Sequence, residues 1–179
     1  MLNVNPRSIY NKKSEFHTLV NEHIIDHITI YESWEHENLS LDQFIQLEDH
    51  TVISNVHQRR GTGGRPAIIV NHKKYNIQDL TQSLISIPWG VEAVWCLVSP
   101  KEVANDSLVK RIAVASIYSK PDSRKKTLLL DHISESYSLL CSKYTEGLYF
   151  IIAGDTNYLK LDSILNLSPN MKQVVSDFT

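Results

Sequence analysis

Short apolar runs alternate with segments of helical periodicity along the whole chain, and this alternation limits the folds open to it. Residues 91–98 and 112–118 are rich in β-branched side chains, as expected of buried strands. Between residues 123 and 144, apolar side chains recur every three or four positions, as expected of a helix with one buried face. Strands that alternate with helices in this way form α/β folds, in which helices cover the sheets.

The same periodicity predicts the remaining elements. Further strands are expected at 2–4, 27–31, 51–56, 66–70 and 148–153, and further helices at 12–22, at 161–165 and after Ser40. The Ser40 hydroxyl can cap the first turn of a short helix. Gly147 is expected to end the long helix in the left-handed conformation. Residues 61–64 are three glycines and a threonine, and this composition predicts a hairpin turn. They lack the Lys-Ser/Thr ending of a phosphate-binding loop.

Size and composition indicate one domain. The chain has 179 residues, 42% of them hydrophobic, which suffices for one sizeable core. We expect a single domain over residues 1–179 that lacks its last segment, because no clear strand or helix closes it. The longest apolar runs reach about six to eight residues, well below the roughly 20 that span a bilayer. Since the chain also starts without a secretory signal, we expect an intracellular protein with no membrane partner.

Charge and cysteine content exclude some classes of protein. A net charge of -2 argues against nucleic-acid binding by bulk electrostatics, so any such binding must be local. Local basic stretches occur at 59–74 and 120–126, and solvated loops and phosphate-facing surfaces explain them equally well. Cys96 and Cys141 lie far apart within apolar segments, and we expect them to be reduced core residues.

Five side chains of potential chemical use stand where predicted strands end. They are Asn5, Glu32, Tyr118, Asp155 and Asn157. Ligand sites of α/β sheets gather at such ends, because the loops there are free of the hydrogen-bond ladder. Each residue alone also has an ordinary structural explanation, as a turn residue, a surface acid or a core aromatic. Their joint placement favours a functional site.

The order of short motifs around these residues resembles a known series. The motifs are Asn5-Pro6-Arg7-Ser8, Tyr31-Glu32-Ser33-Trp34, Gly63-Gly64-Arg65-Pro66-Ala67-Ile68, Ile117-Tyr118-Ser119-Lys120-Pro121 and Ala153-Gly154-Asp155-Thr156-Asn157. The series resembles the endonuclease/exonuclease/phosphatase superfamily, in particular its non-LTR retrotransposon endonuclease branch. The resemblance implies a four-layer αββα sandwich, with two packed mixed sheets flanked by helices, that is incomplete at its C-terminus.

The resemblance also implies roles for the five residues. Glu32 would bind the metal, with Asn5 near the site, and Tyr118 would contact the phosphate. Asp155 would position or activate the attacking water, and Asn157 would hold the phosphate oxygens. The implied cofactor is Mg²⁺, with Mn²⁺ as an alternative, and the implied activity is DNA cleavage in the nucleus. DNA is the implied partner, and a reverse transcriptase domain of the full-length parent is a second candidate. The residue types suit this chemistry, since a hard cation held by carboxylate oxygen neutralises charge that develops on a phosphodiester.

The sequence departs from the family's pattern at two places. Thr156 stands where the family has an aromatic residue between the aspartate and the asparagine. The family's later acidic residues and its Asp-His pair have no match, since Asp177 is not followed by histidine. Two alternatives therefore stay open: a catalytically inactive fragment or binding module of the same fold, and a phosphatase acting on small or lipid phosphoesters. His23 and His27 are four residues apart, but the helix gives way to a strand between them and a zinc site is not expected.

Overall fold

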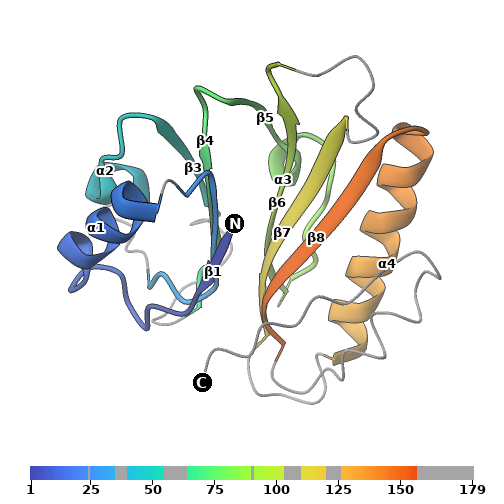
Figure 1. Cartoon of the computed structure of the whole chain (residues 1–179). Coiled ribbons are helices and arrows are strands. Elements are labelled where there is room, and N and C mark those ends of the chain that lie inside the picture. Colours follow the sequence, from blue (N-terminus) through green and yellow to red (C-terminus); the bar gives the residue numbers. More distant parts are fainter. Residues whose placement is uncertain are drawn as a thin grey trace.

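Two four-stranded β-sheets pack face to face, with helices on their outer faces, in the computed structural model of the chain (Figure 1). The structure describes residues 1–23, 25–34, 40–54, 64–89, 91–102, 110–119 and 126–156. Each sheet contains both parallel and antiparallel neighbours, so the predicted α/β sandwich of two mixed sheets is confirmed. The helix predicted at 161–165 lies outside the described residues.

The first sheet has the strand order β1-β2-β4-β3. Its strands are β1 (Leu2–Val4), β2 (His27–Ile30), β3 (His50–Ser54) and β4 (Ala67–Asn71). Strand β1 runs parallel to β2, whereas β4 is antiparallel to both of its neighbours. Two helices supply the apolar side chains that pack with this sheet. They are α1 (Lys13–His23), with Phe16 and Val20, and α2 (Leu41–Ile45), with Leu41 and Ile45.

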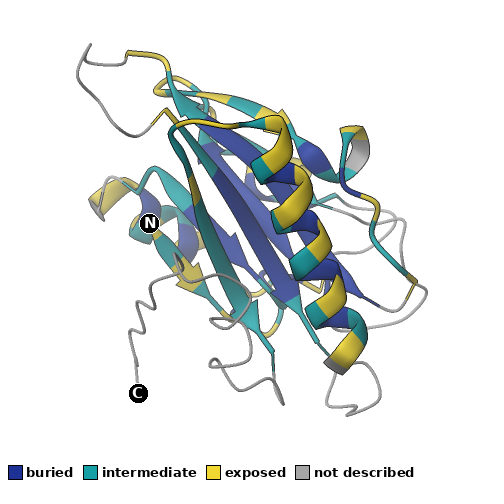
Figure 2. Ribbon diagram, turned by 90° about the vertical axis from the view of Figure 1, so that its right-hand side faces the viewer, coloured by how far each residue is buried: buried dark blue, intermediate teal, exposed yellow. Residues whose placement is uncertain are grey.

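The second sheet has the order β5-β6-β7-β8. Its strands are β5 (Tyr75–Asp79), β6 (Glu92–Pro100), β7 (Arg111–Tyr118) and β8 (Leu148–Asp155). The long helix α4 (Lys126–Lys143) and the short helix α3 (Leu80–Ser83) pack with it. Helix α4 turns its buried stripe toward the sheet and its exposed face outward (Figure 2). The indole N–H of Trp95 donates to Nε2 of His132 at 3.1 Å within this layer.

Strand β6 shows why the two sheets stack. Val94, Cys96 and Val98 belong to the cluster between the sheets, whereas Trp95 and Leu97 belong to the cluster under α4. Side chains of a strand alternate between its two faces, so a strand that is apolar on both faces must be covered on both. Cys96 is therefore the core residue expected, and burial raises the pKa of its thiol. Cys141 is only half-buried on α4.

One of the two predicted helix ends, the cap at Ser40, is confirmed. The Ser40 hydroxyl accepts a hydrogen bond from the N–H of Gln43, and the Ser40 N–H donates to the Gln43 side chain. This capping box satisfies two backbone donors that the first turn of α2 leaves unpaired. Gly147 adopts the expected left-handed conformation, at φ 64°, but α4 ends four residues earlier at Lys143, so Gly147 belongs to the turn that leads into β8 and does not cap the helix. Among the described helices, none is long and apolar enough to cross a membrane.

Two elements and one burial pattern differ from the expectation. Strand β5 and helix α3 were not predicted, because alternate positions of β5 are polar and its apolar content is low. The side chains of β8 are mostly half-buried, although their sequence predicts a fully buried strand. β8 lies at the edge of its sheet, where one side has no neighbouring strand among the described residues.

Candidate active site

Four strands present their carboxyl ends at the same end of the sandwich. β1 and β2 are parallel in the first sheet, and β7 and β8 are parallel in the second. The buried hydroxyl of Ser116, near the end of β7, donates to the carbonyl of Ile30, the last residue of β2, at 2.7 Å. The two parallel pairs therefore end side by side (Figure 1).

Tyr118 and Asp155 form the part of the site that the second sheet supplies. They are the last residues of β7 and β8 and are Cα partners in the parallel register. The N–H of Ser119 donates to the carbonyl of Asp155 at 2.8 Å, which extends the pairing past the strand ends. Gly154 has φ +142°, and a Cβ there would overlap the carbonyl oxygen of Ile117. Only glycine allows the two backbones to approach so closely beside Asp155.

Glu32 is half-buried just beyond β2, in a segment held by backbone hydrogen bonds. Its carbonyl accepts from the N–H of Ser8 at 3.1 Å. The next residue, Ser33, is fully buried, and both its N–H and its hydroxyl donate to the carbonyl of Arg65, at 3.3 and 2.6 Å. These contacts tie the segment to the chain that enters β4. The backbone that carries Glu32 is therefore anchored on both sides.

The surroundings of Tyr31, the last residue before Glu32, show where Glu32 and Asp155 lie. Burial raises the pKa of the Tyr31 phenol, and the negative charges of Asp155 and of Glu32 raise it further. The carbonyl of Ile30, the residue before Tyr31, accepts from Ser116, and Ser116 pairs in register with Ala153, two residues before Asp155. The structure thus places Glu32 and Asp155 on the same side of the molecule.

Glu92 also lies at the candidate site, although the sequence pattern did not predict it. It begins β6, is 8% exposed, and is the Cα partner of Tyr118. Its Oε2 accepts a hydrogen bond from the N–H of Arg65 at 3.0 Å. Gly64, at φ +72°, leaves room for this carboxylate, because a Cβ there would overlap Oε2. The only sequence signal was an acid at the start of an apolar strand, where burial of a charge requires a partner.

Asn5 and Asn157 remain predictions. Asn5 is exposed after β1, and its Oδ1 accepts from the N–H of Arg7 at 3.0 Å. That contact is a local Asx turn, which is the ordinary explanation for an asparagine at this position. Asn157 lies outside the described residues.

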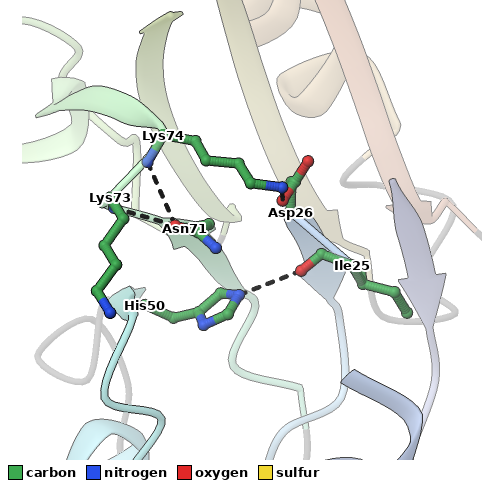
Figure 3. Close-up of polar contacts among 6 residues, drawn as sticks. All are labelled: Ile25, Asp26, His50, Asn71, Lys73 and Lys74. Carbon is green, nitrogen blue, oxygen red and sulfur yellow. Dashed lines mark hydrogen bonds and ion pairs between the residues drawn. The ribbon is translucent and has the colours of Figure 1, made fainter. Parts of the chain in front are cut away.

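The first basic stretch, residues 59–74, does not lie as a whole at the candidate site. Lys73 and Lys74 follow β4 at the end opposite Glu32, where they pair with Asp49 at 2.6 Å and with Asp26 at 2.8 Å. The Asn71 side chain accepts from both lysine backbone N–H groups (Figure 3). These two lysines therefore support a turn and do not face the site. Residues 59–63 and most of 120–126 lie outside the described part of the chain.

The donor set fits a hard divalent cation. Glu32 and Asp155 provide carboxylate oxygen, the ligand that Mg²⁺ and Mn²⁺ prefer. Among the described residues, no three His, Cys, Asp or Glu side chains gather into a metal-binding group. A cation here would be held by one or two carboxylates, with water and phosphate oxygens as its other ligands, which is the usual form of Mg²⁺ sites.

Comparison with solved structures supports the fold. The human Nocturnin catalytic domain, with a bound sulfate anion, aligns with a TM-score of 0.57 at 11% identity, over 87% of this chain and 60% of that one. An endonuclease/exonuclease/phosphatase from Bacteroides vulgatus aligns with a TM-score of 0.57 at 12% identity, over 92% and 69%. The 3' phosphatase NExo from Neisseria, bound to a product DNA hairpin, aligns with a TM-score of 0.54 at 12% identity, over 87% and 56%.

The sequence itself matches no protein-family model and no curated protein. The chain spans between 56% and 69% of the length of the three solved structures. At identities of 11 to 12% the likeness concerns the fold alone. The chain therefore has the two-sheet fold of the endonuclease/exonuclease/phosphatase structures.

Proposed function

We propose that this chain is the larger part of a metal-dependent phosphodiesterase domain that cleaves DNA, of the retroelement endonuclease type. The observation that carries the proposal is that Glu32 and Asp155, 123 positions apart in the sequence, stand where β2 and β8 end at the same end of the sandwich, joined there by the hydrogen bond from Ser116 to the carbonyl of Ile30. Carboxylates at strand ends are costly unless water, hydrogen bonds or a cation receives them. The likeness to structures of nucleases and phosphatases supports the same chemistry.

The residues would divide the hydrolysis between them. Glu32 would hold the Mg²⁺ or Mn²⁺ ion, which when bound neutralises charge on the phosphate oxygens. The Asp155 carboxylate would orient the attacking water and accept its proton. The Tyr118 hydroxyl and the Asn157 amide would donate hydrogen bonds to the phosphate without adding negative charge. Asn5 would support the metal side of the site.

The fold holds the backbones of Tyr118, Asp155 and Glu32 in defined positions. Tyr118 and Asp155 end neighbouring strands in register, so their separation is set by the sheet. Ser33 and Arg65 hold the backbone beside Glu32 through buried hydrogen bonds. Preorganised polar groups stabilise developing charge without the cost of reorienting solvent. Water oxygen would bond to phosphorus as one P–O ester bond breaks, and the leaving oxygen would take up a proton.

Nicking of supercoiled plasmid tests the proposal. The chain, alone and within its complete reading frame, is assayed with Mg²⁺, with Mn²⁺ and with EDTA. We expect metal-dependent nicking that falls by about two orders of magnitude or more in Asp155→Asn, which removes the proposed acid-base group, and in Glu32→Gln, which removes the proposed metal ligand. Glu135→Gln, an exposed acid on α4, is the matched control and should nick like the parent. Equal nicking by all three variants would exclude these roles.

Monoester hydrolysis is the second candidate, because one of the solved structures with this fold is a 3' phosphatase. The endonuclease and phosphatase candidates are distinguished by comparing the rate of hydrolysis of nicked DNA that ends in a 3' phosphate with the rate of nicking of intact plasmid. Preference for the phosphorylated end with no nicking would replace the endonuclease assignment by a phosphatase assignment.

A further inference from the structure

Two of the three tryptophans are exposed, and the third shows that the fold can bury one. Trp95 is fully buried and donates its indole N–H to His132. Trp34 is 40% exposed and Trp89 is 89% exposed. A large aromatic surface left in water forgoes stabilisation that burial would provide, and tryptophan is a side chain on which nucleic-acid bases stack.

Trp34 borders the candidate active site. It lies two residues after Glu32, and its N–H donates to the carbonyl of Gly64 at 3.3 Å. Gly64 in turn packs against Glu92 and the ring of Tyr118. Trp34 adopts φ 55°, a left-handed conformation that is uncommon for a bulky residue and is held here by its hydrogen bond. The backbone therefore fixes the direction of the Cα–Cβ bond of Trp34.

Trp89 borders the same end from the second sheet. It lies three residues before Glu92, the partner of Tyr118, so at most about 10 Å of chain separates Trp89 from the site. The N–H of Val91 donates to the carbonyl of Pro88 at 3.1 Å and closes the short segment that carries Trp89. One exposed tryptophan is thus linked to each partner of the Gly64–Glu92 contact: Trp34 by its hydrogen bond to Gly64, and Trp89 by three residues of chain to Glu92.

Arg7 adds a cation to this rim. It is exposed, it adopts φ 45°, and it precedes Ser8, whose N–H donates to the carbonyl of Glu32. Within the described ranges, no carboxylate forms an ion pair with Arg7. A guanidinium is well suited to bind phosphate, and the other charges expected to meet substrate here, Glu32 and Asp155, are acidic.

We infer that Trp34 and Trp89 stack on unpaired bases of a nucleic-acid strand, and that Arg7 binds a phosphate of the same strand. The inference rests on the proposed function and narrows its substrate to nucleic acid with unpaired bases next to the cleaved phosphate. Aromatic side chains stack on every base, and a groove that combines them with cations binds single strands. A small phosphoester offers no base to stack on, so a rim of this kind would not serve it.

The tryptophans themselves report binding. Fluorescence of the full chain is titrated in EDTA with a single-stranded oligonucleotide and with an abasic oligomer of equal length and charge. We expect quenching by the oligonucleotide and weaker binding of the abasic strand. Trp34→Ala and Trp89→Ala should each weaken binding about 5- to 150-fold, as for loss of one stacked base. Trp34→Phe and Trp89→Phe keep an aromatic face and should restore most of the affinity.

Two controls complete the test. Tyr149→Ala removes an aromatic ring that is 49% exposed near the opposite end of β8, and should bind like the parent. Arg7→Gln should lower the slope of log K against log salt by about 0.7, as for one phosphate contact to a single strand. Equal binding of the two oligomers, or unchanged affinity of both alanine variants, would overturn the inference. Because binding is measured without metal, this result is independent of whether the plasmid is nicked.

Discussion

The carboxylate of Glu92 accepts a hydrogen bond from the backbone N–H of Arg65 at 3.0 Å. Glu92 begins a strand of the second sheet, and Arg65 leads into a strand of the first. The carbonyl of Arg65 accepts both donors of Ser33, so one buried carboxylate connects the segment beside Glu32 with the second sheet. Together with the hydrogen bond from Ser116 to Ile30, this contact links the two halves of the site.

Two replacements of Glu92 should distinguish the stability contributed by its hydrogen-bond acceptor from the stability contributed by its negative charge. Glu92→Ala leaves the buried N–H of Arg65 without its acceptor, which we expect to lower the free energy of unfolding by about 1–3 kcal/mol. Glu92→Gln retains a carbonyl oxygen at the same place and should lose less than half as much. Urea denaturation measures both values. If the two variants are equally stable, the contact with Arg65 does not hold the sheets together.

Gly154 should not tolerate a side chain. In Gly154→Ala the methyl group meets the carbonyl of Ile117, and the backbone at φ +142° is strained for any other residue. Gly147→Ala, at φ 64°, is the comparison, since it carries left-handed strain of only about 1–2 kcal/mol. We expect Gly154→Ala to lower the unfolding free energy by more than Gly147→Ala does. The reverse order would mean that β7 and β8 do not approach each other as described.

His132 should make stability depend on pH. Burial lowers its pKa from 6.5 to about 4, and its Nε2 must be unprotonated to accept from Trp95. Between these values the unfolded chain binds more protons than the folded chain, so the contribution is complete above pH 6.5 and is lost as pH falls toward 4. The full effect is on the order of 3 kcal/mol. His132→Gln keeps an acceptor for Trp95 but cannot titrate.

The measurement is the difference in unfolding free energy between parent and His132→Gln across this pH range. We expect the parent to lose stability relative to the variant as the solution becomes more acidic. Burial also lowers the pKa of His27, and the subtraction removes that common contribution. A difference that stays constant with pH would show that His132 is accessible to protons in the folded chain.

Binding of Mg²⁺ should stabilise the chain whether or not it cleaves DNA. At a concentration 100 times the dissociation constant, a single site adds about 2.7 kcal/mol to the unfolding free energy. Thermal unfolding is followed as Mg²⁺ is added to the parent, to Glu32→Gln and to Glu135→Gln. We expect a rising melting temperature in the parent and in the exposed control variant only. Stabilisation without nicking would favour the inactive binding module over the endonuclease.

Local periodicity predicted most of the strands and helices, because burial on one face imposes a repeat of two or of about 3.6 residues that is legible within a short window. It also located three candidate groups, Glu32, Tyr118 and Asp155, at strand ends, where a polar residue interrupts an apolar run. It missed β5, whose alternate polar positions weaken the apolar signal. The half-burial of β8 could not be predicted, since edge position is a property of the sheet.

By itself, therefore, the sequence determined the class of fold, most of its elements and the chemical types present where strands end. The tertiary structure decided which of those ends meet. It brought Glu32 and Asp155 to the same end of the sandwich, paired Lys73 with Asp49 at the opposite end of the first sheet, and placed Glu92 next to Tyr118. The physical reason is range: secondary structure follows from neighbours along the chain, whereas the site depends on contacts that only strand order and sheet packing create.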